Sequence, residues 1–102
     1  MKIVQQGGTL NVSGIEQLAA ANAALFQAAV RAALPARLRQ IKIDLSGTSF
    51  VDCGGLGALI AVRNSARRRN RKITVRLLNP GLRARCLLKL TRADSLFPIE
   101  SH

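Results

Sequence analysis

The chain has 102 residues, enough for one domain around a single hydrophobic core but not for two. Hydrophobic residues make up 48% of the sequence and aromatic residues only 3%, so small and aliphatic side chains must fill that core. Sixteen lysines and arginines against five acids give a net charge of +11, which favours an acidic protein, nucleic acid or anionic lipid as partner.

The amino-terminal part predicts strands and then a long helix. Residues 2–4 and 9–12 are short strand candidates around a glycine pair, and they could form a hairpin or one kinked strand. Ser13 and Glu16 then have the spacing of a capping box, which predicts that an amphipathic helix begins there and ends at Pro35. The apolar face of this helix would contain Ile15, Leu18, Leu25, Phe26, Ala29, Val30 and Ala33.

Strands and helices alternate through the rest of the chain. The sequence predicts a strand at 39–45, a helix at 56–70, a strand at 72–78 and a strand at 96–99. Between the last two strands it predicts a helix with Asn79 as its cap and Pro80 as its first residue, ending near residue 91. Because parallel neighbours need helical connections of this length, the alternation predicts an α/β fold with a largely parallel sheet.

The most informative motif is the turn between the strand at 39–45 and the following helix. It reads Phe50-Val51-Asp52-Cys53-Gly54-Gly55-Leu56-Gly57. A strand that enters a helix through small residues exposes backbone N–H groups at the positive end of that helix, where anionic groups are favoured. We therefore expect a ligand, a modification site or a docking surface at this turn.

Three pieces of this region resemble the STAS domain of bacterial anti-sigma factor antagonists: Asp44-Leu45-Ser46-Gly47, Phe50-Val51-Asp52 and Gly55-Leu56-Gly57. The closing Leu96-Phe97-Pro98-Ile99 is similar to the last strand of that family, so the resemblance covers roughly residues 8–99. It implies a mostly parallel sheet of four to five strands, with the helices packed mainly on one face. Compared with that family, we expect this chain to lack the first edge strand.

The sequence departs from the family at its phosphorylation site. Members that are switched by a kinase carry Ser or Thr immediately before the glycine that corresponds to Gly55, whereas this chain has Gly54 there. We therefore hypothesise that phosphorylation at the usual position does not control partner binding. Alternatively, a nearby hydroxyl takes over that role; the candidates are Ser46, Thr48 and Ser49.

The resemblance implies a non-enzymatic module that captures an anti-sigma factor of the histidine-kinase-like ATPase type and so releases a sigma factor. Asp52 would contact the partner or cap the helix, and the glycines would permit close approach. The residues expected at the partner surface are Asp52, Cys53, Gly54, Gly55, Leu56, Arg63, Arg67 and Arg71. An alternative is a STAS subunit that stabilises the ATPase of a lipid-transport ABC system, because such subunits can carry an Asp-Thr-Gly-Gly-Leu turn.

Other chemistries have little support. With five acids and one terminal histidine, we expect no catalytic site, metal site or cofactor, and the turn lacks the Lys-Ser/Thr pair of a phosphate-binding P-loop. Eleven cations lie between Arg63 and Arg92 without an acid, but no aromatic residue accompanies them, so any nucleic-acid binding should be non-specific. A solvated basic face is the alternative.

We expect Cys53 to be a small, buried thiol. No apolar run could span a bilayer and no signal peptide is recognisable, which predicts a cytoplasmic protein.

Overall fold

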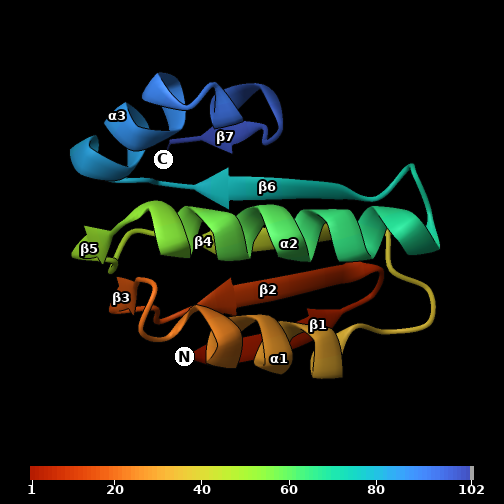
Figure 1. Cartoon of the computed structure of the whole chain (residues 1–102). Coiled ribbons are helices and arrows are strands. Elements are labelled where there is room, and N and C mark those ends of the chain that lie inside the picture. Colours follow the sequence, from red (N-terminus) through yellow and green to blue (C-terminus); the bar gives the residue numbers. More distant parts are fainter. Residues whose placement is uncertain (102) are drawn as a thin grey trace.

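The computed structural model describes residues 1–101, and its centre is a five-stranded sheet in the order β1-β2-β4-β6-β7 (Figure 1). Its strands are β1 Lys2–Gln6, β2 Thr9–Ser13, β4 Gln40–Asp44, β6 Thr74–Leu78 and β7 Ile99–Glu100. The pair β1 and β2 is antiparallel, and every other neighbouring pair in this sheet is parallel. The prediction of a mostly parallel sheet is therefore confirmed.

Of the two possibilities for the amino-terminal segment, the structure shows the hairpin. Lys2 pairs with Ser13 and Gln6 with Thr9, and the chain reverses at Gly7, whose φ is +61°. Glycine adopts this left-handed conformation without steric cost. The expectation that the first edge strand is missing is wrong, because β1 occupies that edge of the sheet.

The helices α1 Ala23–Ala33 and α2 Cys53–Arg69 lie side by side across one face of the sheet, as Figure 1 shows. Alternate strand residues point under them and are fully buried: Leu10, Val12, Ile41, Ile43, Val75 and Leu77. The residues between these on the other face are half-buried, and they are mostly polar: Thr9, Asn11, Gln40, Lys42, Thr74 and Arg76. Helices therefore cover one face, and this explains why parallel strands alternate in hydropathy here.

The predicted helix start at Ser13 is wrong. Gly14 has a φ of +67°, and the chain then runs extended into β3 Gln17–Leu18, which pairs in parallel with β5 Phe50–Val51. Asn22 ends this extended segment, since its side chain accepts a hydrogen bond from Ala19 N at 2.8 Å and donates one to the carbonyl of Gln17 at 2.7 Å. Helix α1 begins only at Ala23, without a side-chain cap.

Other element boundaries also differ from the predictions. Helix α2 begins at Cys53, three residues before the expected start, because Asp52 caps it. Helix α3, Leu82–Leu90, begins after Gly81 rather than at the Asn79-Pro80 pair, since Asn79 has a left-handed φ of 51°. A short 3₁₀ helix, η1 Ala93–Ser95, precedes β7. None of the helices in residues 1–101 is both long enough and apolar enough to span a membrane.

Candidate partner-binding site

Asp52 joins the start of α2 to the segment that follows β3. Its Oδ1 accepts hydrogen bonds from Gly55 N at 2.9 Å and from Ala20 N at 3.0 Å. The first of these bonds satisfies a backbone donor that the helix itself leaves unpaired. The Gly55 N–H is also the main reason why the pKa of Asp52 lies below its usual value; partial burial opposes this, and the N–H groups of Ala20 and Gly54 add to the lowering. The carboxylate is thus a helix cap and a cross-link between two segments.

The two glycines after Cys53 are crowded by the same segment. A Cβ atom at Gly54 would lie 2.5 Å from the Cβ of Ala20, and one at Gly55 would overlap the backbone carbonyl of Leu18. Such contacts do not occur between real side chains, so the 18–20 segment would have to move before either position could carry one. The close approach expected of these glycines is therefore an approach by the chain's own backbone.

An apolar groove lies between the start of α2 and α3. We call it the α3 groove; it has a volume of about 430 Å³ and is lined by Val51, Asp52, Cys53, Leu82, Arg83, Cys86, Leu87 and Leu90. Leu82 is 78% exposed and Leu90 is 83% exposed. Together with Cys86 they occupy positions four residues apart, so they share one face of α3. An exposed apolar stripe of this kind is typical of a surface that is covered by a partner.

Both cysteines are free and exposed, and both line the α3 groove. The expectation that Cys53 is buried is wrong, because the first residue of α2 faces the groove rather than the core. Sequence reasoning also missed α3 as part of the site. The signal was present in the spacing: Ala84 and Leu88 form the buried face of α3, so Leu82 and Leu90 had no place in the core.

The structure separates the arginines of the predicted site from the turn. Leu56 is buried next to the turn and anchors α2 in the core, whereas Arg67 lies in the last turn of α2 and Arg71 lies two residues beyond the end of the helix. At about 1.5 Å per residue, the distance from Asp52 to Arg67 along the helix is roughly 20 Å. Arg63 lies between them, and its Nε donates to the carbonyl of Leu96 at 3.1 Å.

The three alternative phosphate acceptors differ in their surroundings. The hydroxyl of Thr48 donates to the carbonyl of Ile15 at 2.6 Å, and that of Ser49 donates to the carbonyl of Glu16 at 3.1 Å. These bonds attach the 46–49 loop to the segment before β3. Ser46 is exposed. Its backbone N–H, rather than its hydroxyl, donates a hydrogen bond to Oδ1 of Asp44 at 3.0 Å. Phosphorylation at any of the three stays a prediction.

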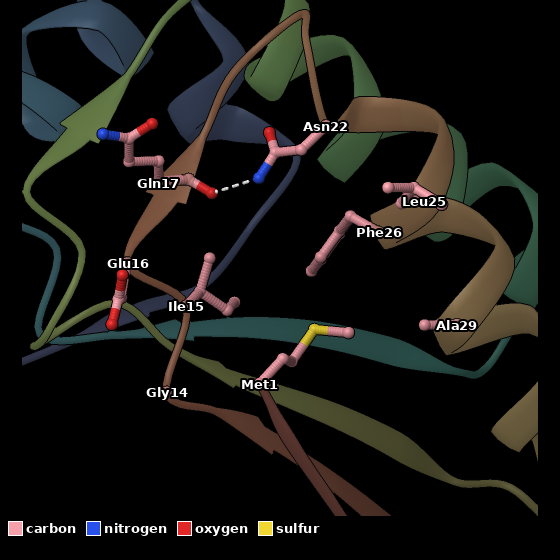
Figure 2. A pocket seen from close by; sticks show the side chains of 9 residues that line it. All are labelled: Met1, Gly14, Ile15, Glu16, Gln17, Asn22, Leu25, Phe26 and Ala29. Atoms are coloured by element: carbon pink, nitrogen blue, oxygen red, sulfur yellow. Dashed lines mark hydrogen bonds between the residues drawn. The ribbon is translucent and has the colours of Figure 1, made fainter.

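A second cavity, of about 610 Å³, lies between the amino terminus, residues 14–17 and α1. Figure 2 shows Phe26 on α1 and Ile15 opposite it, and the hydrogen bond from Asn22 to Gln17 above them. Leu25 lines the same cavity and is 75% exposed. In residues 1–101, no group of three or more histidine, cysteine, aspartate or glutamate side chains is placed to hold a metal ion.

The comparisons agree with this architecture. A family model described as Mlab, STAS domain, matches residues 2–97. A putative anti-sigma factor antagonist of Thermotoga maritima, TM1081, matches with a TM-score of 0.83 and 18% identity, over 99% of this chain and 86% of that chain. Phosphorylated SpoIIAA of Bacillus matches with a TM-score of 0.67 and 15% identity, over 96% of this chain and 88% of that chain.

A domain of a membrane protein has the same fold. The murine anion transporter Slc26a9 matches with a TM-score of 0.72 and 22% identity, over 85% of this chain but only 14% of the transporter chain. No curated protein matches the sequence. At these identities the likeness to the solved structures is one of fold.

Proposed function

Because the chain belongs to the STAS domain family, whose Mlab model matches residues 2–97, we propose that it is a non-enzymatic interaction module with a protein partner that docks on the α3 groove. The observation that carries this proposal is the exposed stripe of Leu82, Cys86 and Leu90 beside the capped start of α2. Burying one leucine of this stripe in an interface would contribute about 1.5–3 kcal/mol of hydrophobic free energy.

The packing around Gly54 supports docking without a phosphate switch. A phosphate adds about 1.5 to 2 negative charges and needs a hydroxyl to carry it. Gly54 has no hydroxyl, and a serine there would collide with Ala20. The turn is therefore a fixed structural support for the groove, and partner binding depends on the shape and apolar character of the groove.

The partner that we propose is the ATPase of a lipid-transport ABC system. STAS subunits of such systems can carry an Asp-Thr-Gly-Gly-Leu turn, and residues 52–56 read Asp-Cys-Gly-Gly-Leu. The residue in the threonine position is Cys53, which is exposed at the groove. A small side chain at this position can contact a partner, whereas the two following glycines are enclosed by the 18–20 segment.

A second candidate partner is an anti-sigma factor. It is favoured by the Asp44-Leu45-Ser46-Gly47 bend and by Gly57, which both agree with the antagonist pattern. Such a partner would use the same groove, and capture would be constitutive rather than controlled at Gly54. The two candidates thus differ in the identity of the partner and not in the docking surface.

The test measures binding of the full chain to the purified ABC ATPase and to the purified anti-sigma factor of the same organism. The double variant L82S/L90S should weaken binding to the true partner at least tenfold, about 1.4 kcal/mol. The variant L25S is the matched control, since Leu25 is equally exposed but lies outside the α3 groove. Equal binding by L82S/L90S and the wild-type protein would place the interface elsewhere.

A further inference from the structure

A hollow lined by arginines lies at the carboxyl-terminal end of α2, away from the α3 groove. We call it the arginine hollow; its volume is about 670 Å³, and it is lined by Arg63, Asn64, Arg67, Arg68, Arg69, Asn70 and Arg71. Five arginines therefore line one open hollow. The two asparagines place amide groups, which both donate and accept hydrogen bonds, in the same lining.

Among residues 1–101, none of the arginines of this hollow forms an ion pair with an acid. Four of the five acids lie near the carboxyl-terminal ends of the parallel strands, which is the opposite end of the sheet from the hollow: Glu16, Asp44, Asp52 and Glu100. The fifth, Asp94, lies in η1. The ion pair found among residues 1–101 joins Arg76 to Glu100 at 3.2 Å, outside the hollow. The molecule thus carries its acids mainly at one end and a concentrated positive charge at the other.

Two of the arginines are held in place by main-chain carbonyl groups. Nε of Arg63 donates to the carbonyl of Leu96 at 3.1 Å, and a terminal nitrogen of Arg67 donates to the carbonyl of Ile73 at 3.3 Å. A guanidinium group has five N–H donors, so each of these side chains keeps further donors for a ligand. Fixing them in advance lowers the entropy that a ligand must overcome on binding.

The positive field of the hollow outweighs the helix dipole. The end of α2 contributes the equivalent of roughly half a negative charge, against five full positive charges from the arginines. Arg63 and Arg67 are also four residues apart on the helix, where like charges repel. An anion bound between them would relieve this repulsion.

We propose that the arginine hollow binds an anion that carries two or more adjacent phosphate groups. Planar guanidinium groups bind phosphate oxygens in pairs, and adjacent phosphates supply the charge density that five arginines match. Recognition of a nucleobase is not supported, because Phe26 and Phe97 are buried and Phe50 lies in β5, at the other end of α2. The phosphates could belong to a soluble polyphosphate or to the headgroups of an anionic membrane.

The first arm of the test uses inorganic tripolyphosphate and the full chain, with calorimetry for affinity and NMR chemical shifts for location. The variant R68Q/R71Q should bind at least tenfold more weakly, because both side chains are exposed lining residues of the hollow. The variant R31Q/K89Q is the matched control, since it removes the same charge elsewhere and should change affinity less than threefold. Equal losses in the two variants, or shifts spread over the whole surface, would overturn the proposal by showing a response to net charge alone.

The second arm identifies the source of the phosphates. Vesicles of phosphatidylcholine with and without phosphatidylglycerol are mixed with the wild-type protein and both variants, and bound protein is measured by flotation. Phosphatidylglycerol-dependent flotation that R68Q/R71Q loses assigns the hollow to headgroups, whereas tripolyphosphate binding without flotation assigns it to a soluble ligand. A DNA duplex completes the series: duplex binding without tripolyphosphate binding would overturn the proposal.

Discussion

At its amino-terminal end, α2 packs so closely against residues 18–20 that neither Gly54 nor Gly55 has room for a side chain. At its carboxyl-terminal end, the same helix presents long, charged side chains to an open hollow. The first end is specified by backbone packing and tolerates little change in shape. The second end carries charged side chains, most of which are exposed. The contrast teaches that the motif most distinctive in the sequence is largely structural, while the surfaces available to partners lie beside it or far from it.

The largest effect should come from a side chain at Gly55. In the variant G55A the new methyl group overlaps the carbonyl of Leu18, and the backbone must shift, so we expect a loss of roughly 3 kcal/mol or more in the free energy of unfolding. Urea denaturation followed by circular dichroism measures it.

The helix contains its own control for this experiment. Gly57 is in the same turn of α2, and a Cβ atom there meets nothing within 4 Å. The variant G57A should therefore gain about 0.5–1 kcal/mol, since alanine favours a helix over glycine. A G55A protein as stable as the wild type would mean that the crowded end does not differ from the rest of the helix.

Much of this architecture could be predicted from the sequence, because hydrophobic alternation is a local signal. The alternation of strand and helix patterns predicted the largely parallel sheet and the helix after Asp52, whereas the packing of the helices on one face was implied by the resemblance to the STAS domain. The segment at 15–18 could not be predicted, since Leu18 is extended only because it pairs with Val51, more than thirty residues away. Its local sequence, rich in alanine behind Ser13 and Glu16, is that of a helix. A non-local pairing overrode the local preference.

The candidate site was predicted in part for the same reason. The turn residues were found through a motif, but the roles of Gly54 and Gly55 depend on where residues 18–20 lie. Cys53 was expected to be buried, and no local pattern shows that α3 leaves it open on the groove side. The spacing of Leu82 and Leu90 outside the buried face of α3 was the one local signal for the groove.

The next effect concerns the two thiols of the α3 groove, which lies beside the amino-terminal end of α2. Cys53 and Cys86 are exposed in the α3 groove, so both should react with a maleimide in the folded protein. The added group fills the groove, and labelling should weaken partner binding at least tenfold, about 1.4 kcal/mol. Mass spectrometry gives the extent of labelling and interferometry the affinity. The variant C53S/C86S has no thiol for the reagent, so its affinity should be the same before and after treatment; if treatment still weakens its binding, the reagent acts elsewhere.

The charge of Asp52, at the amino-terminal end of α2, should make the free energy of unfolding depend on pH. Its pKa in the folded protein lies below the ordinary value of 3.8, chiefly through the N–H of Gly55. The carboxylate therefore stabilises the fold above that value, and the stabilisation is lost as the pH falls through the lowered folded pKa. The variant D52N keeps a hydrogen-bond acceptor but not the charge. Denaturation from pH 7 to pH 3 should show the wild-type advantage over D52N constant at first and shrinking below about pH 4; a constant difference throughout would contradict this role.

The smallest change in the free energy of unfolding should come from the carboxyl-terminal end of α2, and it should be a gain rather than the loss expected for G55A. Arg71 lies just beyond the last turn of α2 and faces the other arginines of the hollow, so R71Q removes repulsion without touching the helix. We expect a gain of about 0.2–0.5 kcal/mol at low salt, the size of a like-charge pair on a helix surface. In about 1 M salt, where the screening length is only about 3 Å, the gain should disappear. K2Q removes the same charge from the exposed edge strand β1 and should give no such gain. A salt-dependent gain confined to R71Q would show that the arginines of the hollow repel one another and destabilise the fold, as expected of a site that binds an anion. Equal gains in R71Q and K2Q would instead show that stability responds only to the net charge of the protein.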